Sequence, residues 1–248
     1  QDGLPVPRDC LAFIGGKGPE VPLAEKRALA GMLFRLLEGV PGAEQFIESV
    51  GEENLMSLVL SFGSSSFMFI HDAAWNAGLT LGLGLDNPEL FRLIYDEKLR
   101  PLVALALAEE LGAVVIERRE RGDITMDVLT LQGPFMLPVT PALAFYDGWL
   151  LLTTDAGMAE KVREVALGQS RAVYDNDDYR LVERQLPGVR VSGFASADKL
   201  VKLLAMTPGL ELPQAVQLLS DRYALVSTGG ARSGDIAEGV LLVSTRTY

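Results

Sequence analysis

Apolar residues recur along the chain at two spacings, one typical of helices and one typical of strands. Large apolar residues repeat every three or four positions over residues 23–38, which predicts an amphipathic helix. Short apolar runs bounded by turn residues predict strands. In chain order we expect a strand at 10–14, helices at 23–38 and 43–50, strands at 57–62, 67–71 and 78–85, a helix at 88–110 with a break near Pro101, strands at 113–118 and 124–131, a hairpin at 142–154, helices at 158–167 and 177–186, a strand at 189–195, helices at 196–206 and 213–220, and strands at 223–228 and 238–245.

Turn residues group the strands into hairpins. The expected turns are Gly-Ser-Ser-Ser at 63–66, Gly-Asp at 122–123 and Asp-Gly at 147–148. The last is the clearest, because Asp-Gly favours the type I′ turn whose twist matches paired strands. Strands in hairpins and helices in blocks predict the α+β class: an antiparallel sheet with helices packed mainly on one face.

The two halves of the chain are weakly similar in the order of their predicted elements. Each half contains a hairpin, then a capped helix, then further strands, and a stretch rich in glycine and proline at 133–141 marks the seam between them. We therefore expect an N-terminal α+β half at 1–132 and a C-terminal α+β half at 142–248, either as similar units or as one continuous domain.

Charge and composition narrow the class of protein. The chain has 248 residues, 48% hydrophobic and 22% charged, and a net charge of −11, so it has enough apolar material to fold without disulfides. The acidic balance argues against nucleic acid and against anionic lipid surfaces, because the densest basic run, at 117–121, contains its own carboxylates. No apolar run approaches the roughly 18–20 residues of a membrane span.

The single histidine and the single cysteine limit the chemistry available. His71 and Asp72 are adjacent in an expected strand, so their side chains point to opposite faces and cannot form a catalytic pair. One histidine and one cysteine are too few for a zinc site, and we expect no transition metal. Cys10 is expected to be unpaired within the chain and buried.

The densest carboxylate cluster is Asp175, Asp177 and Asp178. It does not fit the EF-hand pattern, and a polar loop with Asp177 or Asp178 capping the next helix is the simpler interpretation. Weak calcium binding by these three carboxylates stays open.

Ser196 and Lys199 match the Ser-x-x-Lys spacing at the start of a helix. In penicillin-recognising enzymes this spacing lets the lysine accept a proton from the serine. The companion motifs of those enzymes are missing, so we expect Ser196 to be a helix cap and Lys199 to be solvated.

Gly78, Gly82 and Gly84 superficially suggest a phosphate loop, but their spacing fits none of the known motifs. Glycines that alternate with leucines in a strand favour close packing by another element. Trp75 and Trp149 lie near turns, where an indole covers a core edge or lines a ligand site.

The segment at 142–186 carries a family resemblance. It consists of the hairpin Ala-Leu-Ala-Phe-Tyr-Asp-Gly-Trp-Leu-Leu-Leu-Thr-Thr, a helix, and an acidic-capped helix that ends in Leu-Pro-Gly. This order resembles bacterial envelope proteins of domain-of-unknown-function family 3352, as do the opening at 4–13 and the strand and helix at 195–204. The resemblance implies export to the periplasm or cell surface and implies no activity or site residues.

We therefore expect an exported, non-enzymatic protein that binds a protein partner or assembles in the cell envelope. Its first residue is Gln1 rather than methionine, and signal-peptide removal is one explanation. The alternatives are a carrier of an apolar small ligand or lipid, and a serine hydrolase that uses Ser196 and Lys199. No catalytic residue, cofactor or metal site is predicted.

Overall fold

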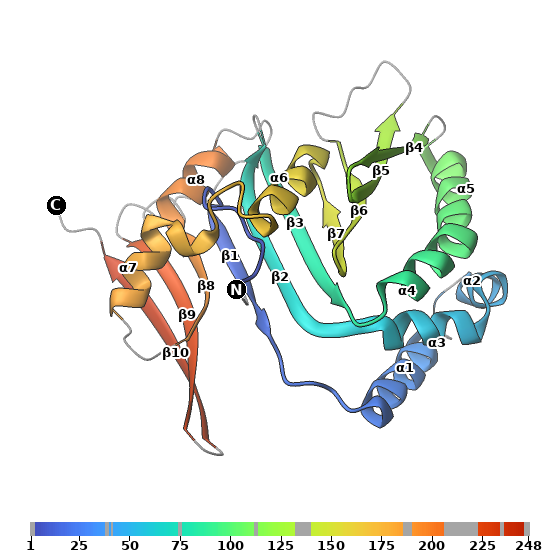
Figure 1. The fold of residues 1–248 in the computed structure, drawn as a ribbon, viewed down its shortest axis with the longest axis horizontal. Coiled ribbons are helices and arrows are strands. Elements are labelled where there is room, and N and C mark those ends of the chain that lie inside the picture. The colour runs from blue at the N-terminus through green and yellow to red at the C-terminus, as the bar shows by residue number, and fades with distance from the viewer. Residues whose placement is uncertain are drawn as a thin grey trace.

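One ten-stranded antiparallel sheet forms the centre of the protein in the computed structural model (Figure 1). The structure describes residues 3–37, 40, 42–73, 76–111, 114–131, 140–185, 190–205, 223–233 and 236–245. Its strands follow the order β10-β9-β8-β1-β2-β3-β7-β6-β5-β4 across the sheet. They are β1 (Ala12–Lys17), β2 (Phe62–Ala73), β3 (Asn76–Leu85), β4 (Val114–Arg121), β5 (Ile124–Leu131), β6 (Ala142–Tyr146), β7 (Trp149–Thr153), β8 (Arg190–Ser196), β9 (Tyr223–Ser233) and β10 (Ile236–Thr245).

The helices are α1 (Leu23–Leu37), α2 (Ala43–Val50), α3 (Glu52–Ser61), α4 (Pro88–Ile94), the π-helix η1 (Tyr95–Leu99), α5 (Arg100–Leu111), α6 (Ala156–Ala166), the short 3₁₀-helix η2 (Val173–Asp175), α7 (Asp177–Gln185) and α8 (Ala197–Ala205). The expected helix at 213–220 lies outside the described residues. These elements confirm the predicted α+β class with an antiparallel sheet.

Blocks of two or three strands from the two predicted halves are interleaved in the sheet. Strand β3 pairs with β7, β5 pairs with β6, and β1 pairs with β8, so each half contributes neighbours to the other. The boundary at 132–142 stays a prediction.

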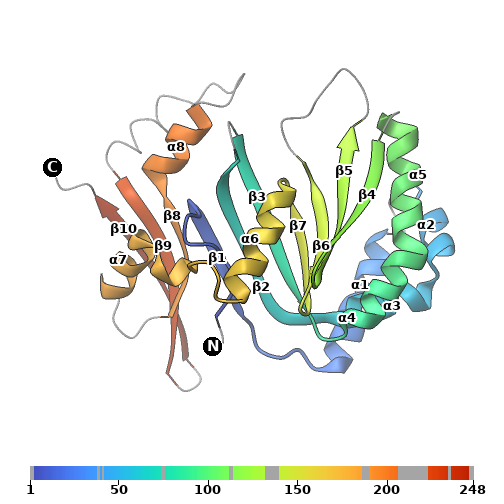
Figure 2. The ribbon, with the colours of Figure 1, turned by 45° about the horizontal axis from the view of Figure 1, so that its top comes forward.

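Helices pack against both faces of the sheet rather than mainly one (Figures 1 and 2): α6 packs on one face, and α3 and α4 pack on one end of the other. Strand β6 shows the division, since Ala142 and Ala144 belong to a core cluster with α6, whereas Phe145 belongs to a second cluster with α3 and α4. We call these the α6 face and the groove face. Alternating residues of a strand point to opposite faces, so a strand that is apolar on both sides needs cover on both.

The hairpin at 142–154 forms as predicted. Strands β6 and β7 pair antiparallel, and the turn residues Asp147 and Gly148 have φ angles of 41° and 76°. Positive φ at both positions is the requirement of a type I′ turn, and Asp-Gly tolerates it.

The predicted strand at 57–62 and its turn at 63–66 are wrong. Residues 57–61 belong to helix α3, whose buried Leu55 and Leu58 are three residues apart, and β2 continues through the four small residues at 63–66. A register shift between Phe62 and Ser66 takes up the irregularity in the pairing with β3. A glycine followed by three serines favours a turn, but small residues are equally compatible with a bulged strand.

Pro101 does not break its helix. The π-helix η1 joins α4 directly to α5, and Pro101 is the second residue of α5. A π-turn changes the backbone hydrogen-bond pattern, so a proline that follows it can be accommodated without ending the helix.

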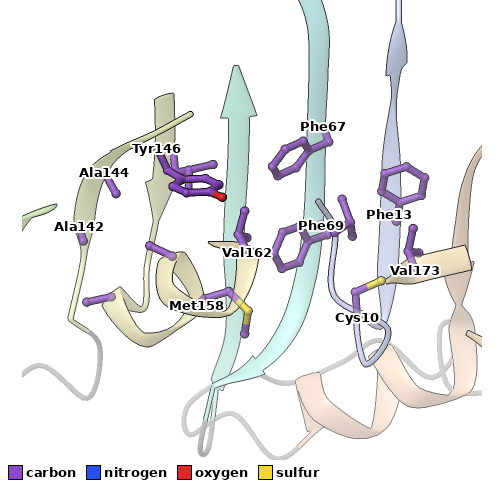
Figure 3. Close-up of a cluster of buried hydrophobic side chains, with 14 of the residues drawn as sticks. Cys10, Phe13, Phe67, Phe69, Ala142, Ala144, Tyr146, Met158, Val162 and Val173 are labelled. Atoms are coloured by element: carbon purple, nitrogen blue, oxygen red, sulfur yellow. The ribbon is translucent and has the colours of Figure 1, made fainter. Parts of the chain in front are cut away.

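Aromatic side chains pack over glycine on the α6 face. Phe67 is buried, and a Cβ atom on Gly82 would lie 2.1 Å from its ring, so only glycine fits at that position. Figure 3 shows Phe67 and Phe69 in one layer with Met158 and Val162 of α6. This confirms the interpretation of the alternating glycines as close-packing positions.

Helix α1 forms as predicted but does not bury its apolar stripe. Its inward residues are Lys26, Ala30 and Phe34, while Leu29, Met32, Leu33 and Leu36 are each about half exposed or more. Among the described elements, α1 packs mainly against α3, and its apolar stripe stays exposed.

Candidate functional site

A row of apolar side chains crosses the groove face of the sheet. The register aligns one residue from each of eight neighbouring strands, and residues in such a row point to the same face. From β8 to β4 the row is Gly193, Ile14, Met68, Leu81, Leu152, Leu143, Asp127 and Arg118. A parallel row of Ala195, Ala12, Ile70 and Leu79 lies beside it.

The middle of this surface has little cover. Ile14 is 51% exposed, Met68 40% and Leu152 39%, although they lie in the central strands of the sheet. A side chain in the middle of a sheet is ordinarily buried by a packed layer. Four strand spacings of about 4.8 Å separate β1 from β6, so the apolar part of the row extends roughly 19 Å, and Asp127 lies one strand further, on β5. We call this apolar surface the groove.

Two hollows lie along the groove. One, of about 460 Å³, is lined mainly by apolar residues of β3, β4, β5, β6 and β7 and by Val103 of α5; its polar lining residues are Tyr95, Asp127, Thr153 and Thr154. The other, of about 230 Å³, lies over β8, β1 and β2 and includes Ile14 and Met68. The larger hollow has the size of ordinary small-molecule sites.

A buried carboxylate closes the β5 end of the groove. Asp127 is 4% exposed and accepts hydrogen bonds from three side chains. The Tyr95 hydroxyl donates to Oδ2 at 3.0 Å, Arg100 Nε donates to the same oxygen at 3.0 Å, and Arg118 donates through Nε to Oδ1 and through Nη2 to Oδ2. Arg118 also pairs with Asp96. The carboxylate is thus satisfied on both oxygens.

Burial and charge act against each other on Asp127. Burial alone would raise its pKa, but the hydrogen bonds from Arg118 and Tyr95 and the charges of Arg118 and Arg100 outweigh it, so the pKa is lowered. The pKa of Tyr95 is raised, first by burial and then by the neighbouring carboxylate. Asp127 therefore stays ionised and Tyr95 stays protonated, and neither is poised to exchange a proton near neutral pH.

The structure separates His71 from Asp72, as expected. Strand β2 continues to Ala73, with His71 only 3% exposed on the α6 face and Asp72 exposed. Among the residues that the structure describes, neither ring nitrogen of His71 has a hydrogen-bond partner. Burial lowers its pKa, so the ring is neutral at pH 7.

The acidic cluster divides among separate partners. Asp175 pairs with Arg180, Asp177 with Arg8, and Asp178 with Lys199. The predicted cap residues are wrong: the side chain of Asn176 caps α7 by accepting from the backbone N–H groups of Asp178 and Tyr179. Among the described residues, no group of three or more His, Cys, Asp or Glu side chains is placed to hold a metal ion.

Asp178 also joins the two residues of the Ser-x-x-Lys match. Ser196 ends β8, is 1% exposed and donates its hydroxyl to Asp178, to which Lys199 donates at 2.6 Å. The Ser196 hydroxyl is thus bonded to a carboxylate, which would repel an aspartate at position 196; because a hydroxyl that donates can still accept, the expected helix cap stays a prediction. Lys199 is half exposed but pairs with the same carboxylate, so it is not merely solvated as expected.

Cys10 is buried as predicted. Trp149 lies between the buried ring of Phe67 and a polar hollow. Its ring packs at 4.9 Å from that of Phe67, and it also lines a polar hollow of about 520 Å³ beside the segment that joins β1 to α1. In that hollow, Lys26 donates hydrogen bonds to Asp86 and to the backbone carbonyl of Phe62. Trp75 lies outside the described residues.

Sequence reasoning missed the cluster around Asp127. The signal was a lone carboxylate within the alternating run Ile-Thr-Met-Asp-Val-Leu-Thr-Leu of β5. In the sequence, Arg118 belongs to a run whose charges nearly cancel. In the structure, alternation along β4 directs Arg118 inward to Asp127 and directs Arg119 outward, where it pairs with Glu117.

Comparison of the chain with protein-family models, with curated proteins and with solved structures gives no match. No helix in the described part of the chain is long and apolar enough to cross a membrane. The groove and the Asp127 cluster therefore carry the functional argument.

Proposed function

We propose that the protein binds and carries an elongated apolar ligand of lipid type along the groove. The observation that carries the proposal is the apolar row on the central strands, in which Ile14, Met68 and Leu152 are exposed among the described residues. Exposed apolar surface of this kind marks a site for a ligand or partner, and the concave shape with a polar end suits a chain-like molecule.

The magnitude fits a reversible carrier. Covering an apolar patch of roughly 300–600 Å² at about 25 cal/mol per Å² gives about 7–15 kcal/mol before the costs of association. Those costs are of order 4–15 kcal/mol, so the net free energy of binding is at most about 11 kcal/mol, which leaves the ligand able to dissociate.

The test is binding of a neutral fluorescent probe with a long alkyl chain, such as a pyrene-labelled alcohol. Leu152→Gln in the groove is expected to weaken binding at least fivefold. Leu181→Gln on α7 is the matched control, because that leucine is 37% exposed and lies away from the groove. No binding to the parent chain, or equal loss in both variants, would overturn the proposal.

A second candidate is the binding of a protein partner in the cell envelope through the exposed stripe of α1. The specific observation is that four large apolar side chains of one helix face water. Replacing Met32 and Leu36 by serine should then remove a partner that co-purifies with the native protein, while the groove probe still binds. Export remains a proposal from the family resemblance, and cell fractionation tests it.

A further inference from the structure

We infer that the ligand of the groove is a single-chain amphiphile with an anionic head group, held by Arg100 at the β5 end. The inference rests on the proposed function and adds the chemistry of the head group, a carboxylate or a phosphate.

The two arginines that bind Asp127 differ in how many of their N–H groups already donate a hydrogen bond. Arg118 is committed through Nε and Nη2 to Asp127 and Asp96. Arg100 contributes only Nε, so its two Nη atoms make no hydrogen bond within the described structure, and its side chain is 32% exposed. A guanidinium group with both Nη atoms free can donate two parallel hydrogen bonds to a carboxylate or phosphate.

The local charge favours an anion. Arg92 joins the cluster, donating to Thr125 and lying 3.8 Å from Asp96, so three arginines face two aspartates and leave one positive charge in excess. In a chain with a net charge of −11, a local excess of this sign beside an apolar surface is unusual. An anionic head group would balance it.

The geometry joins the head-group position to the groove. Tyr95 and Asp127, which both contact this cluster, line the larger hollow. Val103 lines it too, and residues three apart on a helix lie on the same side, so Arg100 stands one turn from the lining of α5. A chain lying along the groove towards Ile14 would end with its head beside Arg100.

The experiment compares oleate, oleyl alcohol and oleoyl lysophosphatidate, which share one chain, by displacement of the neutral probe. The parent chain is expected to bind oleate about tenfold more tightly than oleyl alcohol. Arg100→Gln should bind oleate no more tightly than oleyl alcohol, and its retained binding of the neutral probe shows that the groove is intact. Arg119→Gln, on the outward side of β4, is the control and should retain the preference.

A second measurement does not depend on any variant. Added salt should weaken the binding of oleate to the parent chain and leave that of oleyl alcohol unchanged, since only the ionic contact is screened. Equal affinity for oleate and oleyl alcohol would overturn the head-group inference alone, whereas failure of both to bind would overturn the carrier as well. The tighter binder of oleate and lysophosphatidate identifies the head group as carboxylate or phosphate.

Discussion

Removing the charge of Asp127 should cost the protein more stability than any other single aspartate change in its cluster. Asparagine keeps the shape of the side chain but presents an amide to donors that now face a carboxylate, from Tyr95, Arg100 and Arg118. Breaking a buried, hydrogen-bonded ion pair costs about 3–5 kcal/mol. Because asparagine retains one acceptor and the arginines are partly exposed, we expect Asp127→Asn to cost about 3 kcal/mol.

Urea unfolding measures this cost, and a thermal melt should show a fall of roughly 6–12 °C for a chain of this size. Asp96→Asn is the matched control, because that carboxylate contacts the same Arg118 but is 31% exposed, and its loss should cost no more than about 1 kcal/mol. If the two variants lose equal stability, the Asp127 cluster is not the buried anchor described above.

Acid should reveal the same interaction in the parent chain. The folded-state pKa of Asp127 is lowered from its usual 3.8, so its contribution is fully present above that value and is lost as pH falls through the folded-state pKa. The stability difference between the parent chain and Asp127→Asn should therefore shrink below about pH 4. A difference that stays constant to pH 2.5 would contradict the assigned pairing.

Three further predictions concern the α6 face. Gly82→Ala should cost about 1–3 kcal/mol in urea unfolding because its Cβ would meet the ring of Phe67, whereas Gly16→Ala, with open space around it, should change stability by less than about 0.5 kcal/mol. Burial lowers the pKa of His71, so stability should fall as pH drops below 6.5, where the unfolded chain takes up the proton first; His71→Leu should remove that slope and cost little, because it replaces two unpaired buried nitrogens. Burial and then Asp9 raise the pKa of Cys10 to about 12, so its native thiol should react with a maleimide at pH 8 about a thousandfold more slowly than in the unfolded chain, and fast native labelling would contradict its burial.

The sequence by itself determined much of the local structure, because local structure depends on residues close together in the chain. Asp147 and Gly148 encode a turn with two positive φ angles, Asn87 and Pro88 encode a helix start, and alternating apolar residues encode strands of an antiparallel sheet. Where two local patterns compete, as at residues 57–66, spacing alone did not decide between helix and strand.

Tertiary structure alone decided which surfaces are covered and which charges meet. The strand order places Leu81 of β3 beside Leu152 of β7, and no pattern within either segment specifies that pairing. It likewise brings Asp127 to Arg100, 27 residues earlier, and within the described residues it leaves Ile14, Met68 and Leu152 partly exposed in the middle of the sheet. Burial is a property of the neighbours that folding supplies, so periodicity predicts that a side chain is apolar but not what covers it.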